Sequence, residues 1–75
     1  MTMRMLKFKD TGPDVLRLQK RLDSLGYRIK HLTGEFDEYT VLALMSYQRA
    51  SGIFSEYGFA DEDTFDALGL NDDGR

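Results

Sequence analysis

Carboxylates are the side chains of this sequence whose type and spacing come closest to those of a catalytic site. Glu35 and Asp37 stand two residues apart in the stretch GEFDEYT, and glycoside hydrolysis uses a pair of carboxyl groups. Both residues, however, lie where a helix is expected to begin, and the helix dipole favours acids there. Spacing along the chain also does not set the separation of two carboxyl groups across a cleft. We therefore interpret this pair as structural.

Other catalytic or metal-binding sets are equally hard to assemble. His31 is the only histidine and cysteine is absent, so neither a zinc site nor a Ser-His-Asp arrangement can be built. The acids of 61–66 and of 71–74 lack the calcium loop that ends in a glutamate. A Gly-rich phosphate loop is also missing from the sequence. We predict a domain that is not an enzyme and has no metal or cofactor.

The length of 75 residues predicts one domain with a small core. We place that domain at residues 6–70, with an N-terminal arm at 1–5 and a tail at 71–75 that frays for lack of an apolar anchor. The sequence has no run as long and apolar as a membrane span, and no signal-peptide pattern. We therefore expect no membrane contact, and the chain shows no export signal.

Charge is divided unevenly along the chain. Residues 1–31 hold eight Lys/Arg and three acids, which gives +5, and residues 32–75 hold two Lys/Arg and ten acids, which gives −8. We expect the two halves to face each other and partly neutralise. A helix-turn-helix would read DNA with one of its later helices, but the later part of this chain is acidic. Nucleic acid is therefore excluded as a predicted partner.

The sequence predicts three helices. Residues 13–25 form the clearest helix, because its apolar residues recur at helical spacing. They are Val15, Leu18, Leu22 and Leu25. Thr11 or Gly12 can cap its start, Pro13 suits the first turn, and Gly26 suits a left-handed end. Asp37 is the expected N-cap of a second helix that ends before Gly52, and Asp61 that of a short third helix that stops near Gly69.

The same phrase precedes the second and third helices. GEFDEYT at 34–40 and GFADEDT at 58–64 both read Gly-x-apolar-Asp-x-x-Thr. The glycine permits a turn with positive φ, and the aspartate caps the helix. Gln19 and Gln48 each precede one copy, and we expect them to bond buried loop backbone rather than a sugar. Two units that share the second helix predict an all-α three-helix bundle with an internal pseudo-repeat.

The ordered pattern over residues 6–68 resembles the type 1 (PGBD-like) peptidoglycan-binding domain family. It reads Gly12-Pro13-x-Val15-x-x-Leu18-Gln19-x-x-Leu22-x-x-x-Gly26-Tyr27, then Gly34-x-Phe36-Asp37-x-x-Thr40-x-x-Ala43-Leu44-x-x-Tyr47-Gln48, then Gly52-Ile53, Gly58, Thr64 and Leu68. The resemblance implies a small orthogonal three-helix bundle that anchors wall hydrolases or phage lysins without being catalytic. It also implies that the chain is wall-associated or is released from a virion or on lysis. The family often has glycine where this chain has Lys9.

The first functional hypothesis is a module that binds the peptidoglycan glycan strand or its stem peptide. We place the site on the loop-to-helix face after the first helix. Its residues are Tyr27, Gly34, Asp37, Tyr39 and Thr40. Tyr27 and Tyr39 offer aromatic faces to a sugar or an apolar peptide group, and the exposed amides before Glu38 offer donors to a carboxylate.

The second hypothesis is a protein-interaction or virion-assembly module that reuses the fold. The family pattern turns Thr40, Ala43, Leu44 and Tyr47 toward the core. Val41, Leu42 and Met45 then form one outward patch, near Leu16 or the N-terminal methionines. Such a patch favours a protein partner or self-association. The alternative is that the helix is slightly rotated, or that the N-terminal arm covers the patch, so that these side chains are buried.

Overall fold

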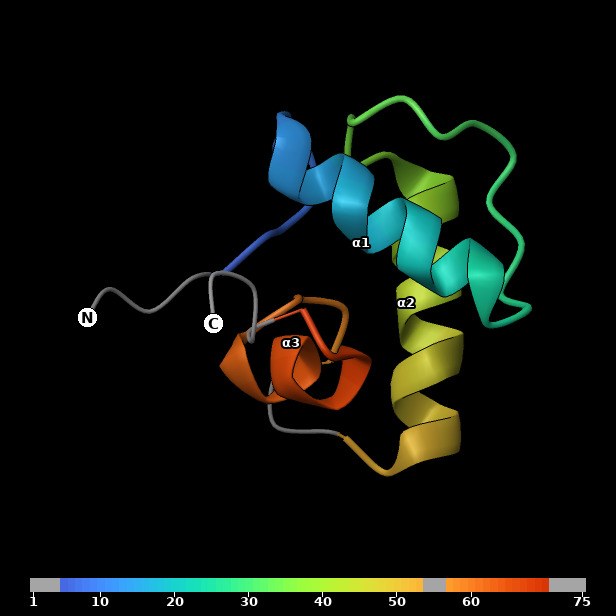
Figure 1. Ribbon diagram of the computed structural model, residues 1–75, viewed down its shortest axis with the longest axis vertical. Helices are drawn as coiled ribbons and strands as arrows, with labels where there is room; N and C mark the ends of the chain where they lie inside the picture. Colours follow the sequence, from blue (N-terminus) through green and yellow to red (C-terminus); the bar gives the residue numbers. More distant parts are fainter. Residues whose placement is uncertain (1–4, 54–56, 71–75) are drawn as a thin grey trace.

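The computed structural model describes residues 5–53 and 57–70, and its ribbon is shown in Figure 1. In these ranges the chain forms three helices and no strand. They are α1 (Pro13–Ser24), α2 (Glu38–Ser51) and α3 (Glu62–Leu68). In Figure 1, α1 lies across the upper part of α2, and α3 lies below α1 and beside α2. The predicted all-α, three-helix fold is confirmed, whereas its orthogonal packing and whole-domain pseudo-repeat stay predictions. The tail, and the arm except for Met5, lie outside the described residues.

Helix α1 starts and ends at the predicted signals. It begins at Pro13, after Gly12, whose φ is 128°. At its other end the amides of Gly26 and Tyr27 donate to the carbonyls of Asp23 and Leu22, both at 3.0 Å. This pair of bonds defines a Schellman motif, which requires the positive φ of 98° at Gly26.

The apolar stripe of α1 is shorter than predicted. Val15, Leu18 and Leu22 are fully buried, as expected. Leu25, which the helical spacing groups with them, is 44% exposed. Leu25 follows the last helical residue, Ser24, and the chain turns away from the core there.

Helices α2 and α3 begin in the same way, as predicted. The Asp37 Oδ1 accepts from the Thr40 amide at 3.0 Å, and the Asp61 Oδ1 accepts from the Thr64 amide at 3.1 Å. Removing such an N-cap costs about 1 kcal/mol. Each helix ends at a glycine, Gly52 or Gly69, with a φ of 75°. The signals read from the sequence therefore locate both helices.

Gln19 connects α1 to the turn before α2. Its Nε2 donates to the Glu35 carbonyl and to the Thr40 Oγ1, both at 2.8 Å, and its Oε1 accepts from the Gly34 amide at 2.8 Å. The side chain is fully buried. The expectation that this glutamine bonds loop backbone is confirmed, and leaving such groups unpaired would be costly.

Gln48 makes the same set of bonds to the turn before α3. Its Nε2 donates to the Phe59 carbonyl at 2.8 Å and to the Thr64 Oγ1 at 3.1 Å, and its Oε1 accepts from the Gly58 amide at 2.8 Å. Gln48 is also fully buried. The bonds of both copies of the Gly-x-apolar-Asp-x-x-Thr phrase are therefore alike.

The segment before α1 pairs with both copies of that phrase. Leu6 exchanges two backbone bonds with Ala60, at 3.0 and 2.9 Å, and Phe36 bonds Lys9 and Asp10 at 2.9 and 2.8 Å. Lys9 has a φ of 85° and is the only non-glycine residue with positive φ among those described. The family often has glycine here, which fits a backbone conformation that glycine adopts without strain.

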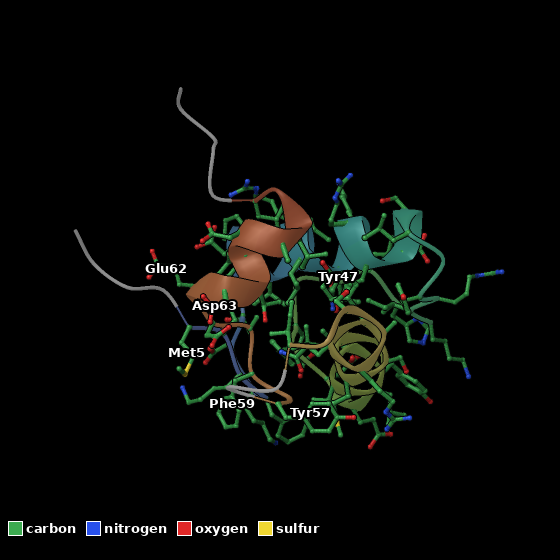
Figure 2. All side chains as sticks on the ribbon, turned by 90° about the horizontal axis from the view of Figure 1, so that it is seen from below. Met5, Tyr47, Tyr57, Phe59, Glu62 and Asp63 are labelled. Carbon is green, nitrogen blue, oxygen red and sulfur yellow. The ribbon has the colours of Figure 1, made fainter. Side chains whose placement is uncertain are left out.

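The core gathers apolar side chains from all three helices and from the segments between them. The buried residues are Leu6, Val15, Leu18, Leu22, Ile29, Phe36, Ala43, Leu44, Tyr47, Ala60, Phe65, Leu68 and Leu70. Tyr47 points from α2 into the space between α1 and α3 (Figure 2). In the described part of the chain, no helix is long and apolar enough to span a bilayer.

Candidate functional site

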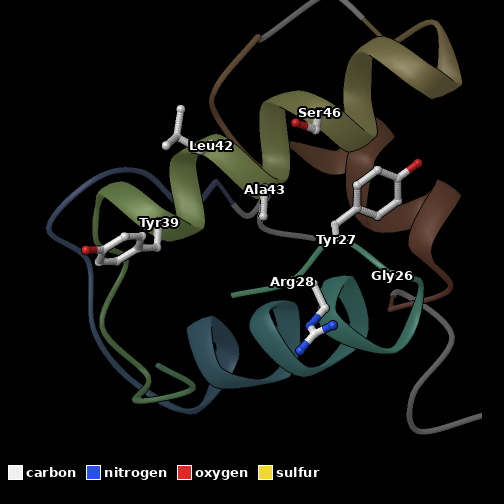
Figure 3. Close-up of a pocket in the computed structure, with 7 residues that line it drawn as sticks. All are labelled: Gly26, Tyr27, Arg28, Tyr39, Leu42, Ala43 and Ser46. Carbon is white, nitrogen blue, oxygen red and sulfur yellow. The ribbon is translucent and has the colours of Figure 1, made fainter. Parts of the chain in front are cut away.

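An open groove of about 340 Å³ lies between the segment after α1 and one side of α2 (Figure 3). The lining residues come from that segment and from the first three turns of the helix. They are Gly26, Tyr27, Arg28, Tyr39, Leu42, Ala43 and Ser46. The two tyrosines predicted to bind the wall, Tyr27 and Tyr39, thus line one groove. They stand at different ends of it in Figure 3.

Each tyrosine ring is held by an aromatic neighbour. Tyr27 is half-buried and meets the Tyr47 ring edge-on, with the ring centroids 5.7 Å apart and the planes at 83°. Tyr39 is 38% exposed and meets the His31 ring at 6.3 Å and 77°. Edge-to-face pairs of this kind are favourable beyond their buried area. The groove therefore has two aromatic side chains in its lining, each with an aromatic neighbour.

The other three predicted wall-binding residues do not line the groove. Gly34 and Thr40 are buried, and Asp37 is half-buried. Gly34 and Thr40 bond Gln19, and the Asp37 carboxylate accepts from both the amide and the hydroxyl of Thr40. Their observed bonds hold the start of α2 and so position Tyr39.

The groove has a cationic rim, which sequence reasoning missed. Arg28 is the only charged residue of 5–53 and 57–70 that lines the groove, and it extends toward α1 in Figure 3. Next to the groove, the Lys30 Nζ lies 5.6 Å from the centroid of the Tyr39 ring, within cation–π range. The signal was present as GYRIKH at 26–31, a stretch with two basic residues and no acid. The direction in which this segment runs depends on Ile29, which is buried and belongs to no motif identified in the sequence.

A second hollow, of about 500 Å³, lies on the other side of Tyr39 and Leu42. It is lined by Phe8, Glu38, Tyr39, Val41 and Leu42. Leu42 is 62% exposed and Phe8 is 49% exposed. We call Phe8, Tyr39, Val41 and Leu42 the apolar face.

Of the triplet on α2 that is predicted to face outward, Leu42 is exposed, whereas Val41 and Met45 are each only partly exposed. Val41 is half-buried and packs against the core. Met45 is also half-buried, and its Cγ and Sδ would lie 3.9 Å from a Cβ on Gly58. The helix buries the predicted face, which is Thr40, Ala43, Leu44 and Tyr47. The core and the loop before α3 in addition cover part of Val41 and Met45.

Groups that could hold a metal ion are not brought together in residues 5–53 and 57–70. No three His, Cys, Asp or Glu side chains gather at a common point there. Glu35, once considered beside Asp37 as a carboxylate pair, is exposed and lines a separate hollow near Thr11, Gly12 and Pro13.

The fold and the site together define a class of protein, a small helical domain with an open groove lined by tyrosines. A family model described as "Putative peptidoglycan binding domain" matches residues 11–68. The chain belongs to this peptidoglycan-binding domain family, so the resemblance predicted from the sequence is confirmed. No curated protein matches the chain.

Solved structures agree with the family. The endolysin of Burkholderia phage AP3 is 29% identical with a TM-score of 0.80, and the match covers 88% of this chain and 25% of the endolysin. A peptidoglycan-binding protein from Clostridioides difficile, solved with glutamine hydroxamate, is 27% identical with a TM-score of 0.82, over 88% of this chain and 40% of that one. The N-terminal domain of SleB is 29% identical with a TM-score of 0.82, over 88% and 89% of the two chains. The chain therefore corresponds to a quarter of the endolysin and to nearly all of the SleB domain.

Proposed function

We propose that this domain binds peptidoglycan in the groove of Figure 3 and is itself not catalytic. The observation that carries the proposal is the placement of Tyr27 and Tyr39 on one open groove in a chain of the peptidoglycan-binding domain family. Where such a domain is part of a longer protein, as in the endolysin, it would hold a hydrolase at the wall.

The groove suits a ligand with alternating apolar and polar groups. Tyr39 presents a ring on which a sugar or an apolar peptide group can pack, and Ala43 forms an apolar wall between the tyrosines. The Ser46 hydroxyl can donate or accept one hydrogen bond. Because the groove is shallow and its polar groups few, we expect weak binding to a single repeat. Attachment to an intact wall then gains from many repeats.

The lining of the groove also supports a binding role over catalysis. Among the described residues it includes no carboxylate and no histidine, and these are the side chains that most often transfer protons in wall hydrolysis. Glu38 is the nearest acid along α2, and it lines the hollow on the opposite side of Tyr39. The groove can therefore orient a ligand, but it holds no acid–base pair to cleave one.

Co-sedimentation with purified sacculi tests this function. The wild-type domain should pellet with sacculi, and Tyr39→Ala should remove this binding. Phe59→Ala is the matched control, because Phe59 is an aromatic residue exposed to the same extent, 39% against 38%, and does not line the groove. The control should pellet like the wild type. Absence of wild-type binding would overturn the function, and loss in both variants would overturn the site.

A second candidate function, interaction with a protein partner or self-association, is favoured by the apolar face. An exposed Leu42 beside an exposed Phe8 leaves an apolar hollow of about 500 Å³ uncovered by the described residues. Phe8→Ser tests this candidate separately, since Phe8 lines the hollow and not the groove. A dimer by light scattering that Phe8→Ser dissociates would support self-association. A monomeric wild type would contradict it.

A further inference from the structure

We infer that the groove takes the anionic stem peptide of peptidoglycan rather than its neutral glycan strand. The inference rests on the proposed function and narrows it to one part of the polymer. Three observations carry it. The rim of the groove is positively charged, the two cations of the rim form no ion pair with another described residue, and the wall of the groove is apolar.

The rim of the groove is positive although the chain is not. The formal net charge of the whole chain is −3. The segment 26–31 nevertheless brings Arg28 into the lining and Lys30 to the Tyr39 ring, and it contains no acid. His31 packs against the same ring. A ligand that enters past this rim is favoured when it carries negative charge.

The two cations are not neutralised by the rest of the described protein. Arg28 and Lys30 are both exposed, and neither forms an ion pair with another residue of 5–53 or 57–70. Lys7 differs, since its Nζ lies 3.4 Å from the Asp10 carboxylate. Asp23, the acid nearest to Arg28 along the chain, accepts from the Ile29 amide at 3.4 Å. The charges of the rim therefore remain available to a ligand.

The chemistry of the polymer decides between its two parts. The sugars of the glycan strand offer hydroxyl and acetamido groups, and the lactyl carboxyl group of the muramic acid is uncharged where it is amide-bonded to the peptide. The stem peptide ends in a carboxylate, can carry further carboxylates on its side chains, and presents alanine methyl groups. Arginine and lysine bind carboxylates by charge-assisted hydrogen bonds, and Leu42 and Ala43 suit methyl groups. The groove therefore matches the peptide in both charge and apolar surface.

Soluble fragments separate the two parts of the polymer. By titration followed by NMR, a disaccharide that carries its stem peptide should bind. The same disaccharide with its lactyl carboxyl group capped as a simple amide in place of the peptide should bind at least about tenfold more weakly. The same peptide-bearing fragment with its carboxylates amidated should lose most of its affinity. Raising the salt concentration should weaken binding of the charged fragment only, because exposed charges are screened. Equal binding of all three fragments would overturn the inference.

Anionic wall polymers other than the stem peptide share its negative charge, so a poly(glycerol phosphate) chain is a necessary fourth probe. It carries phosphates but none of the methyl-bearing amides. We expect it to bind more weakly than the peptide-bearing fragment at equal charge concentration. Equal or tighter binding of the phosphate polymer would overturn the assignment to the stem peptide.

Charge-neutral variants test the residues. Arg28→Gln and Lys30→Gln should each weaken binding of the peptide-bearing fragment by about two- to fivefold, with unchanged thermal unfolding because both residues are exposed. Lys7→Gln is the matched control, since it removes the same charge outside the groove, and it should bind like the wild type. Equal weakening in all three variants would show a general charge effect and overturn the rim assignment. Sacculus binding that survives in an Arg28→Gln/Lys30→Gln double variant, with no loss of affinity, would overturn the inference and leave the proposed function intact.

Discussion

The two copies of the Gly-x-apolar-Asp-x-x-Thr phrase make the same bonds but have different surroundings. In both, a buried glutamine bonds the glycine amide, the next carbonyl and the threonine hydroxyl, and an aspartate caps the helix. The first copy adjoins the groove, whereas the second opens α3, whose exposed Glu62 and Asp63 point outward in Figure 2. Shared residues thus build the fold, and a function has to come from residues that differ.

The positions that differ coincide with the candidate site. Counted from the motif glycines, Tyr39 corresponds to Asp63, and Leu42 corresponds to Asp66. Tyr39 and Leu42 line the groove, while their counterparts are exposed acids on a helix of seven residues. The first copy therefore has an aromatic and apolar surface at the positions where the second copy has an exposed acidic surface. The following predictions test this division between shared and differing residues.

The largest effect should come from the buried glutamines. Gln19→Ala leaves the Gly34 amide and the Glu35 carbonyl without their side-chain partner and removes one of the two bonds of the Thr40 hydroxyl. Gln48→Ala removes the corresponding three bonds at the second copy. We expect each variant to lose about 3 kcal/mol of unfolding free energy, since unpaired buried polar groups are costly. Urea denaturation measures the loss. A loss below about 1 kcal/mol at either site would show that the two networks are not equivalent.

The motif glycines should respond unequally. Gly34 and Gly58 have φ values of 85° and 87°, so alanine at either position is strained. A Cβ on Gly34 would also lie 3.4 Å from the Gly12 carbonyl oxygen, whereas on Gly58 its nearest contacts are the Met45 Cγ and Sδ at 3.9 Å. Gly34→Ala should therefore cost about 2 kcal/mol and Gly58→Ala about 1 kcal/mol. Thermal melts of the two variants measure this, and a reversed order would contradict the close approach at the first copy.

The aspartate caps should respond alike and more weakly. Asp37→Ala and Asp61→Ala each remove the acceptor of a threonine amide, and each should cost about 1 kcal/mol. Asp37→Asn and Asp61→Asn are the controls, because asparagine keeps the cap and should cost much less. Chemical denaturation of the four variants provides the comparison. If the asparagine variants lose as much stability as the alanine variants, negative charge matters more than the cap.

The sequence was a good guide to the shared residues and a poor one to the groove. Pro13, Asp37 and Asp61 marked helix starts, because proline geometry and side-chain caps act within one turn of chain. The exposure of Leu25 and the partial burial of Val41 could not be read from periodicity, which gives a face but not where the packing ends. The groove depends on how the segment after α1 lies against α2, a tertiary contact that local patterns do not encode.

The smallest change in stability, and the most informative, should follow an exchange between the two copies at the position of Tyr39. Tyr39→Asp gives the first copy the residue of the second. Tyr39 is an exposed residue in the first turn of α2, where an acid is favoured by the helix dipole. We therefore expect the unfolding free energy to change by less than about 0.5 kcal/mol.

Binding should respond in the opposite way to the same substitution. Tyr39→Asp removes the ring on which a ligand packs and places a negative charge beside the cationic rim, so binding to sacculi should be lost. The reciprocal change, Asp63→Tyr, should leave binding unchanged, because α3 contributes no residue to the groove. Co-sedimentation and a thermal melt on both variants complete the test. Retained binding in Tyr39→Asp would mean that the difference between the copies carries no function, whereas unfolding of that variant would place Tyr39 among the residues that build the fold.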